Sequence, residues 1–242
     1  MKVLSRLRYS ARFGPLWTKV QWWDDIDWSR YTRSYPSELV QLGSTHTVLL
    51  RDVSFRVSEG RIAIEGKSLH PNHALIYQTA LALRPTSVYE CGVGGCDHLV
   101  NLHTVLPEAE IAGADRSLEQ LVFARSRHDL GWARIEVRDL TLQQPERDIA
   151  DLVFTQAVIM HIHGGDRHRT FLRNMWQLSR RYVLLMENWL RHDFVDDLCA
   201  LFPGQKLYLL RERSAKGLLL DKQNALDYPT VTSDRELRSP RG

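Results

Sequence analysis

Cysteine is scarce in this sequence, and long apolar runs are missing. The 242 residues include only three cysteines, Cys91, Cys96 and Cys199, which are too few for a disulfide framework. Cys91 and Cys96 have neither the spacing nor the partners of a zinc site, so we expect reduced thiols. No segment approaches the ~18 apolar residues that a membrane-spanning helix needs, so no membrane span is expected.

A secretory signal and a strong basic patch are also missing. The first residues, MKVLSRLRYSARFGPLW, are basic but contain neither a continuous apolar segment nor a small-residue cleavage site, which favours a cytoplasmic location. The net charge of +3 is the difference between 32 basic and 29 acidic residues. Since no basic stripe alternates with aromatic residues along one segment, nucleic acid is not the favoured partner.

The length is suited to one sizeable domain with a terminal extension. Apolar residues make up 43% and charged residues 25% of the chain, which is ordinary for a globular protein. We expect an N-terminal extension or cap that includes a β-hairpin over residues 1–66. The main ligand-binding domain is expected over residues 67–228, and a flexible tail over residues 229–242.

The N-terminal extension is rich in aromatic and acidic residues. Two interpretations remain open: the rings pack on the main domain, or they form one wall of a substrate pocket for sugars or planar molecules. For the second, Trp22, Trp28 and Tyr31 are the candidate substrate-binding residues. Residues 47–64 alternate in polarity around Ser58-Glu59-Gly60 and predict the β-hairpin, two short strands joined at this turn.

From residue 71 onward, helical and strand patterns alternate. This order predicts an α/β fold, a doubly wound, mostly parallel seven-stranded sheet that ends in an antiparallel terminal hairpin. The expected helices are 71–83, 97–105, 118–129, 167–179 and 193–201. The expected strands are 87–90, 110–114, 134–137, 149–155, 182–187, 206–211 and 217–221.

The most specific signal is the segment SVYECGVGGCDHL at residues 87–99, a strand that leads through a glycine-rich turn into a helix. It contains Glu90-x-Gly92-x-Gly94, and Asp115 follows 25 residues after Glu90 at the end of the next strand. Glycines allow the backbone to approach a ligand, and a carboxylate at this place can accept both hydroxyls of a ribose. A dinucleotide motif would continue as G-x-G-x-x-G, but its last position holds Asp97, which we expect to cap the helix.

These residues resemble the first motif of the class I S-adenosylmethionine-dependent methyltransferases, an acidic residue followed by alternating glycines. The resemblance spans roughly residues 71–221 and departs from the family at Cys96, where the third glycine would stand. It implies S-adenosylmethionine as cofactor. The cofactor-binding positions that it implies are Glu90 (methionine portion), Gly92 and Gly94 (backbone contacts), Asp115 (ribose), Asp139 (adenine), Arg116 and Leu140 (beside the adenine) and Gln156 (cofactor side).

In the family, residues after the fourth strand lie beside the transferring methyl group and the acceptor. His161 and His163 occupy that region here, and an imidazole with its pKa near 6.5 can take a hydroxyl proton. Glu187, at the end of the next strand, is the further catalytic candidate, and His192, in the loop after it, is the further substrate-binding candidate. A divalent metal held by these groups stays an alternative. The favoured prediction is an O-methyltransferase that acts on a small molecule or a saccharide.

Three other functions stay open at this point. A methyltransferase for RNA or protein is disfavoured because the Asn/Asp-Pro-Pro-aromatic signature is missing after the fourth strand. A non-catalytic nucleotide-binding module is disfavoured by the intact acid and glycine pattern. An NAD-linked oxidoreductase is disfavoured by the glycine count and by Asp97.

Overall fold

A seven-stranded sheet forms the centre of the protein, in a computed structural model that describes residues 48–142, 146–162 and 165–239. The strand order is β5-β4-β3-β6-β7-β9-β8; the first five strands are parallel, and β9 is antiparallel to both β7 and β8. The predicted fold class is therefore confirmed. The strands are β3 (Ser87–Cys91), β4 (Glu110–Asp115), β5 (Ala133–Val137), β6 (Ala150–Gln156), β7 (Ser179–Met186), β8 (Tyr208–Glu212) and β9 (Ala215–Asp221).

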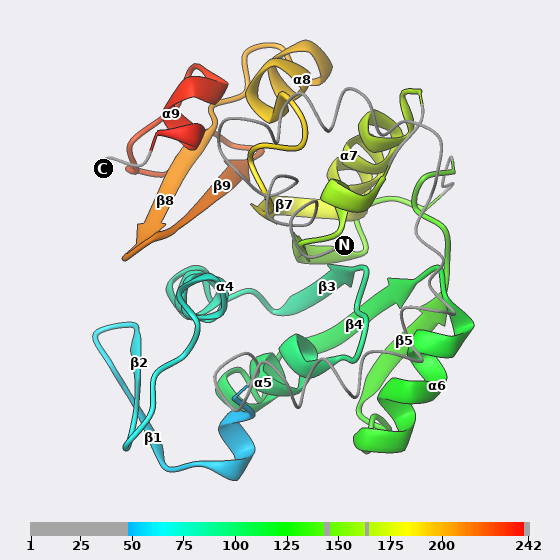
Figure 1. The fold of residues 1–242 in the computed structure, drawn as a ribbon, viewed down its shortest axis with the longest axis vertical. Helices are drawn as coiled ribbons and strands as arrows, with labels where there is room; N and C mark the ends of the chain where they lie inside the picture. The colour runs from blue at the N-terminus through cyan, green and yellow to red at the C-terminus, as the bar shows by residue number, and fades with distance from the viewer. Residues whose placement is uncertain (1–47, 143–145, 163–164, 240–242) are drawn as a thin grey trace, which may run out of the picture.

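Helices cover both faces of this sheet (Figure 1). One face carries α4 (Pro71–Leu83), α5 (Asp97–Val105) and α6 (Leu118–Arg127), whose buried residues share one core cluster. The other face carries α7 (Arg167–Leu178), α8 (Phe194–Leu201) and α9 (Asp234–Arg238), which share a second cluster. Among the described helices, none has the length and apolar character to cross a membrane.

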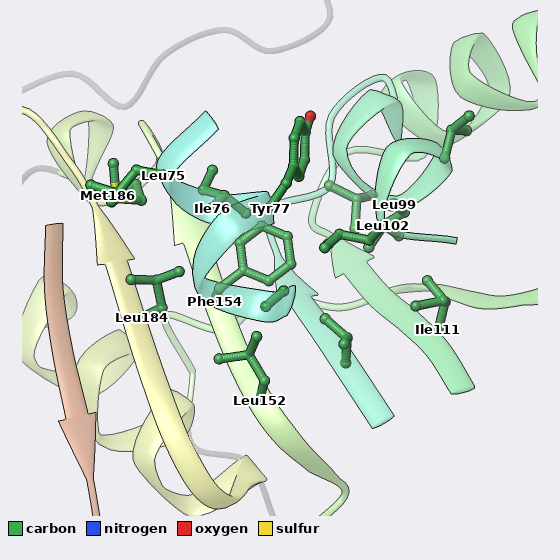
Figure 2. Packing of buried hydrophobic residues seen from close by; sticks show 14 of the residues in the cluster. Leu75, Ile76, Tyr77, Leu99, Leu102, Ile111, Leu152, Phe154, Leu184 and Met186 are labelled. Carbon is green, nitrogen blue, oxygen red and sulfur yellow. The ribbon is translucent and has the colours of Figure 1, made fainter. Parts of the chain in front are cut away.

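Strand β3 lies inside the sheet between β4 and β6, and all five of its residues are buried. Successive side chains of a strand point to opposite faces, so Val88 joins the cluster of α4 and α5, whereas Tyr89 joins the cluster of α7. Figure 2 shows the first cluster, in which Leu152 and Phe154 of β6 lie beneath Ile76 of α4. The burial of every β3 residue thus follows from helices on both faces of the sheet.

The segment before α4 forms the expected hairpin, but over a shorter span. Strands β1 (Phe55–Ser58) and β2 (Arg61–Ile64) pair in antiparallel register around Glu59 and Gly60, which both have positive φ angles, 52° and 72°. Residues 50–52 instead form the short helix η2 (Leu50–Asp52), because Leu50 is completely buried against α5. Residues 1–47, and with them the predicted aromatic cap, lie outside the described residues.

The prediction of a flexible tail over residues 229–242 differs from the structure as far as residue 239. Val231 and Leu237 are buried, the Leu209 N–H donates to the Pro229 carbonyl at 2.7 Å, and α9 follows. The Asp234 carboxylate accepts hydrogen bonds from the Val195 N–H at 3.1 Å and from the next N–H at 3.2 Å. The polar composition suggested disorder, but buried apolar side chains, the Asp234 cap and hydrogen bonds from Lys216 and Arg238 hold this segment.

We expect Asp234→Ala to lower the free energy of unfolding by about 1–2 kcal/mol, because it removes the carboxylate that caps the first turn of α8. Urea denaturation measures the change. The control is Asp227→Ala, at an exposed aspartate seven positions earlier in the chain. An Asp234→Ala variant as stable as this control would contradict the capping role.

Candidate active site

The predicted cofactor residues gather at the carboxyl ends of the parallel strands. In the strand order, the connections from β3 run to β4 and β5 on one side, while β6 and β7 lie on the other side, so β3 and β6 flank the switch point of the sheet. Ligands of open parallel sheets bind at this place. The described candidate residues at this edge are Glu90, Gly92, Gly94, Asp115, Arg116, Asp139, Leu140, Gln156, His161, Glu187 and His192.

Gly92 meets two constraints that exclude a side chain. Its φ angle is +84°, and a Cβ atom added there would lie 2.5 Å from Val158 Cγ2, in the loop after β6. The N–H groups of Gly92 and Val93 both donate to the Ala114 carbonyl, at 2.7 and 3.1 Å. Gly92 therefore lets the turn pass between β4 and the loop that follows β6.

Gly113, in the middle of β4, is a further requirement that the sequence interpretation missed. A Cβ atom there would lie 2.4 Å from Val93 Cγ1 and 2.8 Å from the Glu90 carbonyl oxygen. A glycine inside a strand often marks such a close approach, and this was the available signal. Gly113 makes room beneath the glycine-rich turn.

Cys96 stands where the family pattern has its third glycine, and it adopts a glycine-like backbone. Its φ angle is 60°, in the left-handed region, which costs a residue with a Cβ atom about 1 kcal/mol. The side chain is completely buried in the core. The turn therefore has a left-handed, glycine-like backbone at this position without a glycine. All three cysteines are free thiols, as predicted.

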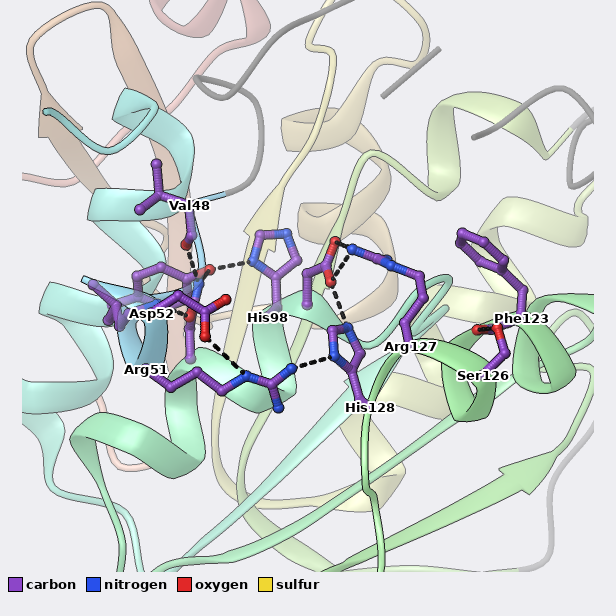
Figure 3. A network of polar contacts seen from close by, with 12 residues as sticks. Val48, Arg51, Asp52, His98, Phe123, Ser126, Arg127 and His128 are labelled. Carbon is purple, nitrogen blue, oxygen red and sulfur yellow. Dashed lines mark hydrogen bonds and ion pairs between the residues drawn. The ribbon is translucent and has the colours of Figure 1, made fainter. Parts of the chain in front are cut away.

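Asp97 does not cap α5, contrary to the prediction. The residue at the N-cap is Cys96, and the Asp97 carboxylate points instead to the end of α6. It pairs with the Arg127 guanidinium at 2.9 Å and with His128 Nε2 at 2.7 Å (Figure 3). Because Arg51 donates to the other ring nitrogen of His128 at 2.9 Å, the His128 proton lies on Nε2 and faces Asp97.

Glu90 is the least compensated polar group at this edge. Its side chain is 1% exposed, and its Oε2 atom has no hydrogen-bond partner among the described residues. Burial raises the pKa of Glu90 well above its usual value, and the nearby Asp115 and Asp97 carboxylates raise it further. A buried, unpaired carboxyl oxygen is a suitable partner for a ligand that brings hydrogen-bond donors or a positive charge.

Asp115 is fixed by the backbone around it. One carboxylate oxygen accepts the Gly94 N–H at 3.0 Å, and the other accepts the Ser117 N–H at 2.9 Å. Burial raises the pKa of Asp115, and these backbone hydrogen bonds oppose the rise. Each oxygen keeps a further lone pair, so the carboxylate is oriented in advance and can still accept ligand hydroxyls.

The next strand places Asp139 beside Asp115, since the Arg138 N–H donates to the Asp115 carbonyl at 2.9 Å. One Asp139 oxygen accepts both the N–H and the hydroxyl of Thr141, at 2.8 and 2.6 Å. Arg116 is half-buried directly after Asp115. Leu140 is 3% exposed and belongs to the core cluster beneath α7, which indicates packing at this position.

Glu187 holds the loop after β6. Its carboxylate accepts the N–H groups of Val158 at 3.1 Å and Met160 at 3.3 Å, and the Thr155 hydroxyl at 3.3 Å. The residue is buried, and desolvation raises the pKa of Glu187 to about 7 although these hydrogen bonds oppose the rise. These contacts give Glu187 a structural task, whereas the sequence suggested a catalytic one at the rim.

His161 and His192 flank the same loop. His161 ends the short helix η3 (Ile159–His161) and is half-buried, at the position that the prediction gave it after β6. His192 Nε2 lies 3.1 Å from the Ile159 carbonyl, and its ring stacks on His168 at 4.3 Å. This ring thus braces the loop backbone, a contact that the substrate-binding prediction did not include.

The remaining predicted residues are His163, Trp22, Trp28 and Tyr31, and they lie outside the described residues. Within the described part of the chain, no group of three or more His, Cys, Asp or Glu side chains is arranged to hold a metal ion.

The chain resembles known proteins in its three-dimensional structure but not in its sequence. No family model and no curated protein matches the chain. The methyltransferase domain of bacterial CtHen1 superposes with a TM-score of 0.52 at 14% identity, over 62% of this chain and 98% of that one. The fold is that of a class I S-adenosylmethionine-dependent methyltransferase.

Two other methyltransferases match less closely. A SAM-dependent methyltransferase from Aquifex aeolicus gives a TM-score of 0.45 at 13% identity, over 56% of this chain and 81% of that one. The plantazolicin methyltransferase BpumL, solved with a substrate analogue and SAH, gives 0.40 at 18% identity over 49% of this chain. The match spans 45% of BpumL, about half its length.

Titration of Glu187 predicts a specific pH dependence of stability. Because its pKa is about 7 in the folded protein and 4.5 ordinarily, the folded protein binds more protons between these values, and stability falls as the pH rises through them. Relative to Glu187→Gln, the wild type should lose up to about 3 kcal/mol of unfolding free energy between pH 4.5 and 8.

Urea denaturation across this pH range measures the difference. Glu108→Gln, at an exposed glutamate, is the control and should follow the wild type at every pH. A constant difference between wild type and Glu187→Gln would show that the Glu187 pKa is not raised.

Proposed function

We propose that this protein transfers a methyl group from S-adenosylmethionine to a hydroxyl group of a small molecule or a saccharide. The observation that supports this cofactor is the presence of two acceptors at the glycine-rich turn. One is the Glu90 oxygen that has no partner among the described residues, and the other is the Asp115 carboxylate, which backbone N–H groups orient. S-adenosylmethionine has an α-ammonium group and two ribose hydroxyls, so its donors suit these two acceptors. The fold of the structural relatives supports the same cofactor class.

When bound, S-adenosylmethionine supplies an electrophilic methyl group. The residues of this chain align the acceptor, exclude water and remove the hydroxyl proton. His161 is the described candidate for that base, and His163 is the second candidate two positions further. The leaning toward a saccharide depends on Trp22, Trp28 and Tyr31 and stays a prediction from the sequence.

The cofactor assignment is tested by calorimetric titration with S-adenosylhomocysteine, S-adenosylmethionine and NAD. We expect the first two to bind and NAD not to bind. Asp115→Asn and Glu90→Gln should each weaken binding about tenfold or more, since each loses a charge-assisted hydrogen bond. Asp227→Asn is the control at an exposed site. NAD binding without S-adenosylhomocysteine binding would refute this assignment.

The base is tested by single-turnover transfer of a labelled methyl group to an active hydroxyl compound, found in a panel of phenols and saccharides. His161→Ala should slow transfer about 100-fold with little change in S-adenosylhomocysteine affinity. His163→Ala is measured alongside, and His103→Ala, at the far end of α5, is the control. Near-normal rates for both variants would remove acid–base work from these histidines, and transfer only to RNA or protein would exclude the small-molecule acceptor.

A further inference from the structure

A chain of hydrogen bonds begins at the backbone of Val48 and Leu50. The Leu50 N–H donates to Asn101 Oδ1 at 2.7 Å, so the oxygen of this amide is identified by a partner that can only donate. Asn101 Nδ2 then donates to the Val48 carbonyl at 2.9 Å and to the Tyr77 hydroxyl at 2.9 Å. Asn101 is completely buried, and both of its Nδ2 hydrogens are therefore assigned.

The chain of hydrogen bonds continues from Asn101 to Tyr77 and His98. Tyr77 accepts the Asn101 hydrogen, and its oxygen lies 2.9 Å from His98 Nδ1 (Figure 3). Burial raises the pKa of Tyr77, so the phenol keeps its proton and can donate it. We assign this proton to the contact with His98 Nδ1, which makes Nδ1 the acceptor and places the proton of the neutral imidazole on Nε2.

The tautomer of His98 determines how the Gln156 amide is oriented. The Nε2 atom lies 3.4 Å from Gln156 Oε1, so the N–H faces the amide oxygen and turns the Gln156 nitrogen away from the ring. A reversed amide would place two donors face to face. The imidazole itself is held by ring contacts with His73 at 4.7 Å and with Phe154 at 6.4 Å, both edge to face.

Gln156 and Glu90 lie on the same face of the sheet. Glu90 is in register with Phe154 on the neighbouring strand, and Gln156 follows two residues later, so its side chain points to the side of α4 and α5. The chain of contacts therefore ends at the carboxyl edge of the sheet, on the face that also carries Glu90 with its unpaired oxygen.

We propose that His98, with Tyr77 and Asn101 behind it, is a positioning residue that fixes the Gln156 amide with both N–H donors toward the methyl donor. This inference rests on the proposed function, and the group that it assigns to these N–H donors is the α-carboxylate of the methyl donor. Glu90 and Gln156 then provide an acceptor and a donor for the two charged ends of one amino-acid group. The Asn101 end ties this orientation to the backbone of residues 48–50.

The direction of the hydrogen bonds is tested in the full wild-type chain, without any ligand. Nitrogen-15 NMR of labelled histidine identifies the protonated ring nitrogen, and His98→Gln assigns the signal. We expect the proton on Nε2, and in Tyr77→Phe the Nδ1 resonance should move to that of a nitrogen without a hydrogen bond. A wild-type His98 with its proton on Nδ1 overturns the proposal.

The effect on the ligand is tested by a double-mutant cycle with S-adenosylhomocysteine as the probe. Gln156→Ala should raise the Kd about tenfold, since it removes hydrogen bonds to a charged carboxylate, and Tyr77→Phe, which only releases this amide, should raise it about fivefold. The double variant should bind no more weakly than Gln156→Ala alone, because Tyr77 acts only through that amide. Tyr208→Phe is the matched control, since it removes a buried hydroxyl that has no partner among the described residues.

The outcomes separate this inference from the proposed function. If the two single effects multiply in the double variant, the positioning role is wrong, whereas the cofactor assignment stands. If the wild type does not bind S-adenosylhomocysteine, the proposed function fails, and the NMR result still decides the direction of the contacts.

Discussion

The carboxyl edge of the sheet depends on the hydrogen bonds that the buried Glu187 carboxyl group accepts. This carboxyl group binds the N–H groups of the loop after β6, and this loop places Val158 directly against Gly92. The glycine-rich turn and the loop are thus packed without room for one additional carbon atom. The local conformation at the carboxyl edge of the sheet therefore depends on the Glu187 hydrogen bonds to the loop and on the close contact between Val158 and Gly92.

Carboxyl groups at this edge have contrasting environments. Asp115 and Glu187 are both satisfied by backbone N–H groups, whereas Glu90 keeps one oxygen unpaired. A protein gains no stability from such an unpaired group, since its burial costs free energy that nothing in the described chain returns. Among these three carboxyl groups, Glu90 is the one whose burial is not compensated by hydrogen bonds to both of its oxygens within the described chain.

The fold could be predicted almost completely from the sequence. Helix α5 lies over the predicted residues, because period and glycine punctuation agree there. The glycine-rich turn and the place of Asp115 at the end of β4 were also predicted, since both follow from the local sequence. The tasks of Asp97 and Glu187 were not, because each depends on partners about 30 residues away, and sequence spacing does not give these contacts. The chain of hydrogen bonds from Asn101 through Tyr77 and His98 to Gln156 was missed for the same reason.

The last segment of the chain has a consequence for association between molecules. Strand β8 is at one end of the sheet, and residues 229–231 pair with it through the Leu209 N–H, the Leu207 carbonyl and a bridge between Tyr208 and Thr230. An open strand edge presents unpaired backbone groups on which a second copy can add a strand. Residues 229–231 occupy the backbone groups at the start of this edge, so a strand from a second copy cannot pair there unless this segment is displaced.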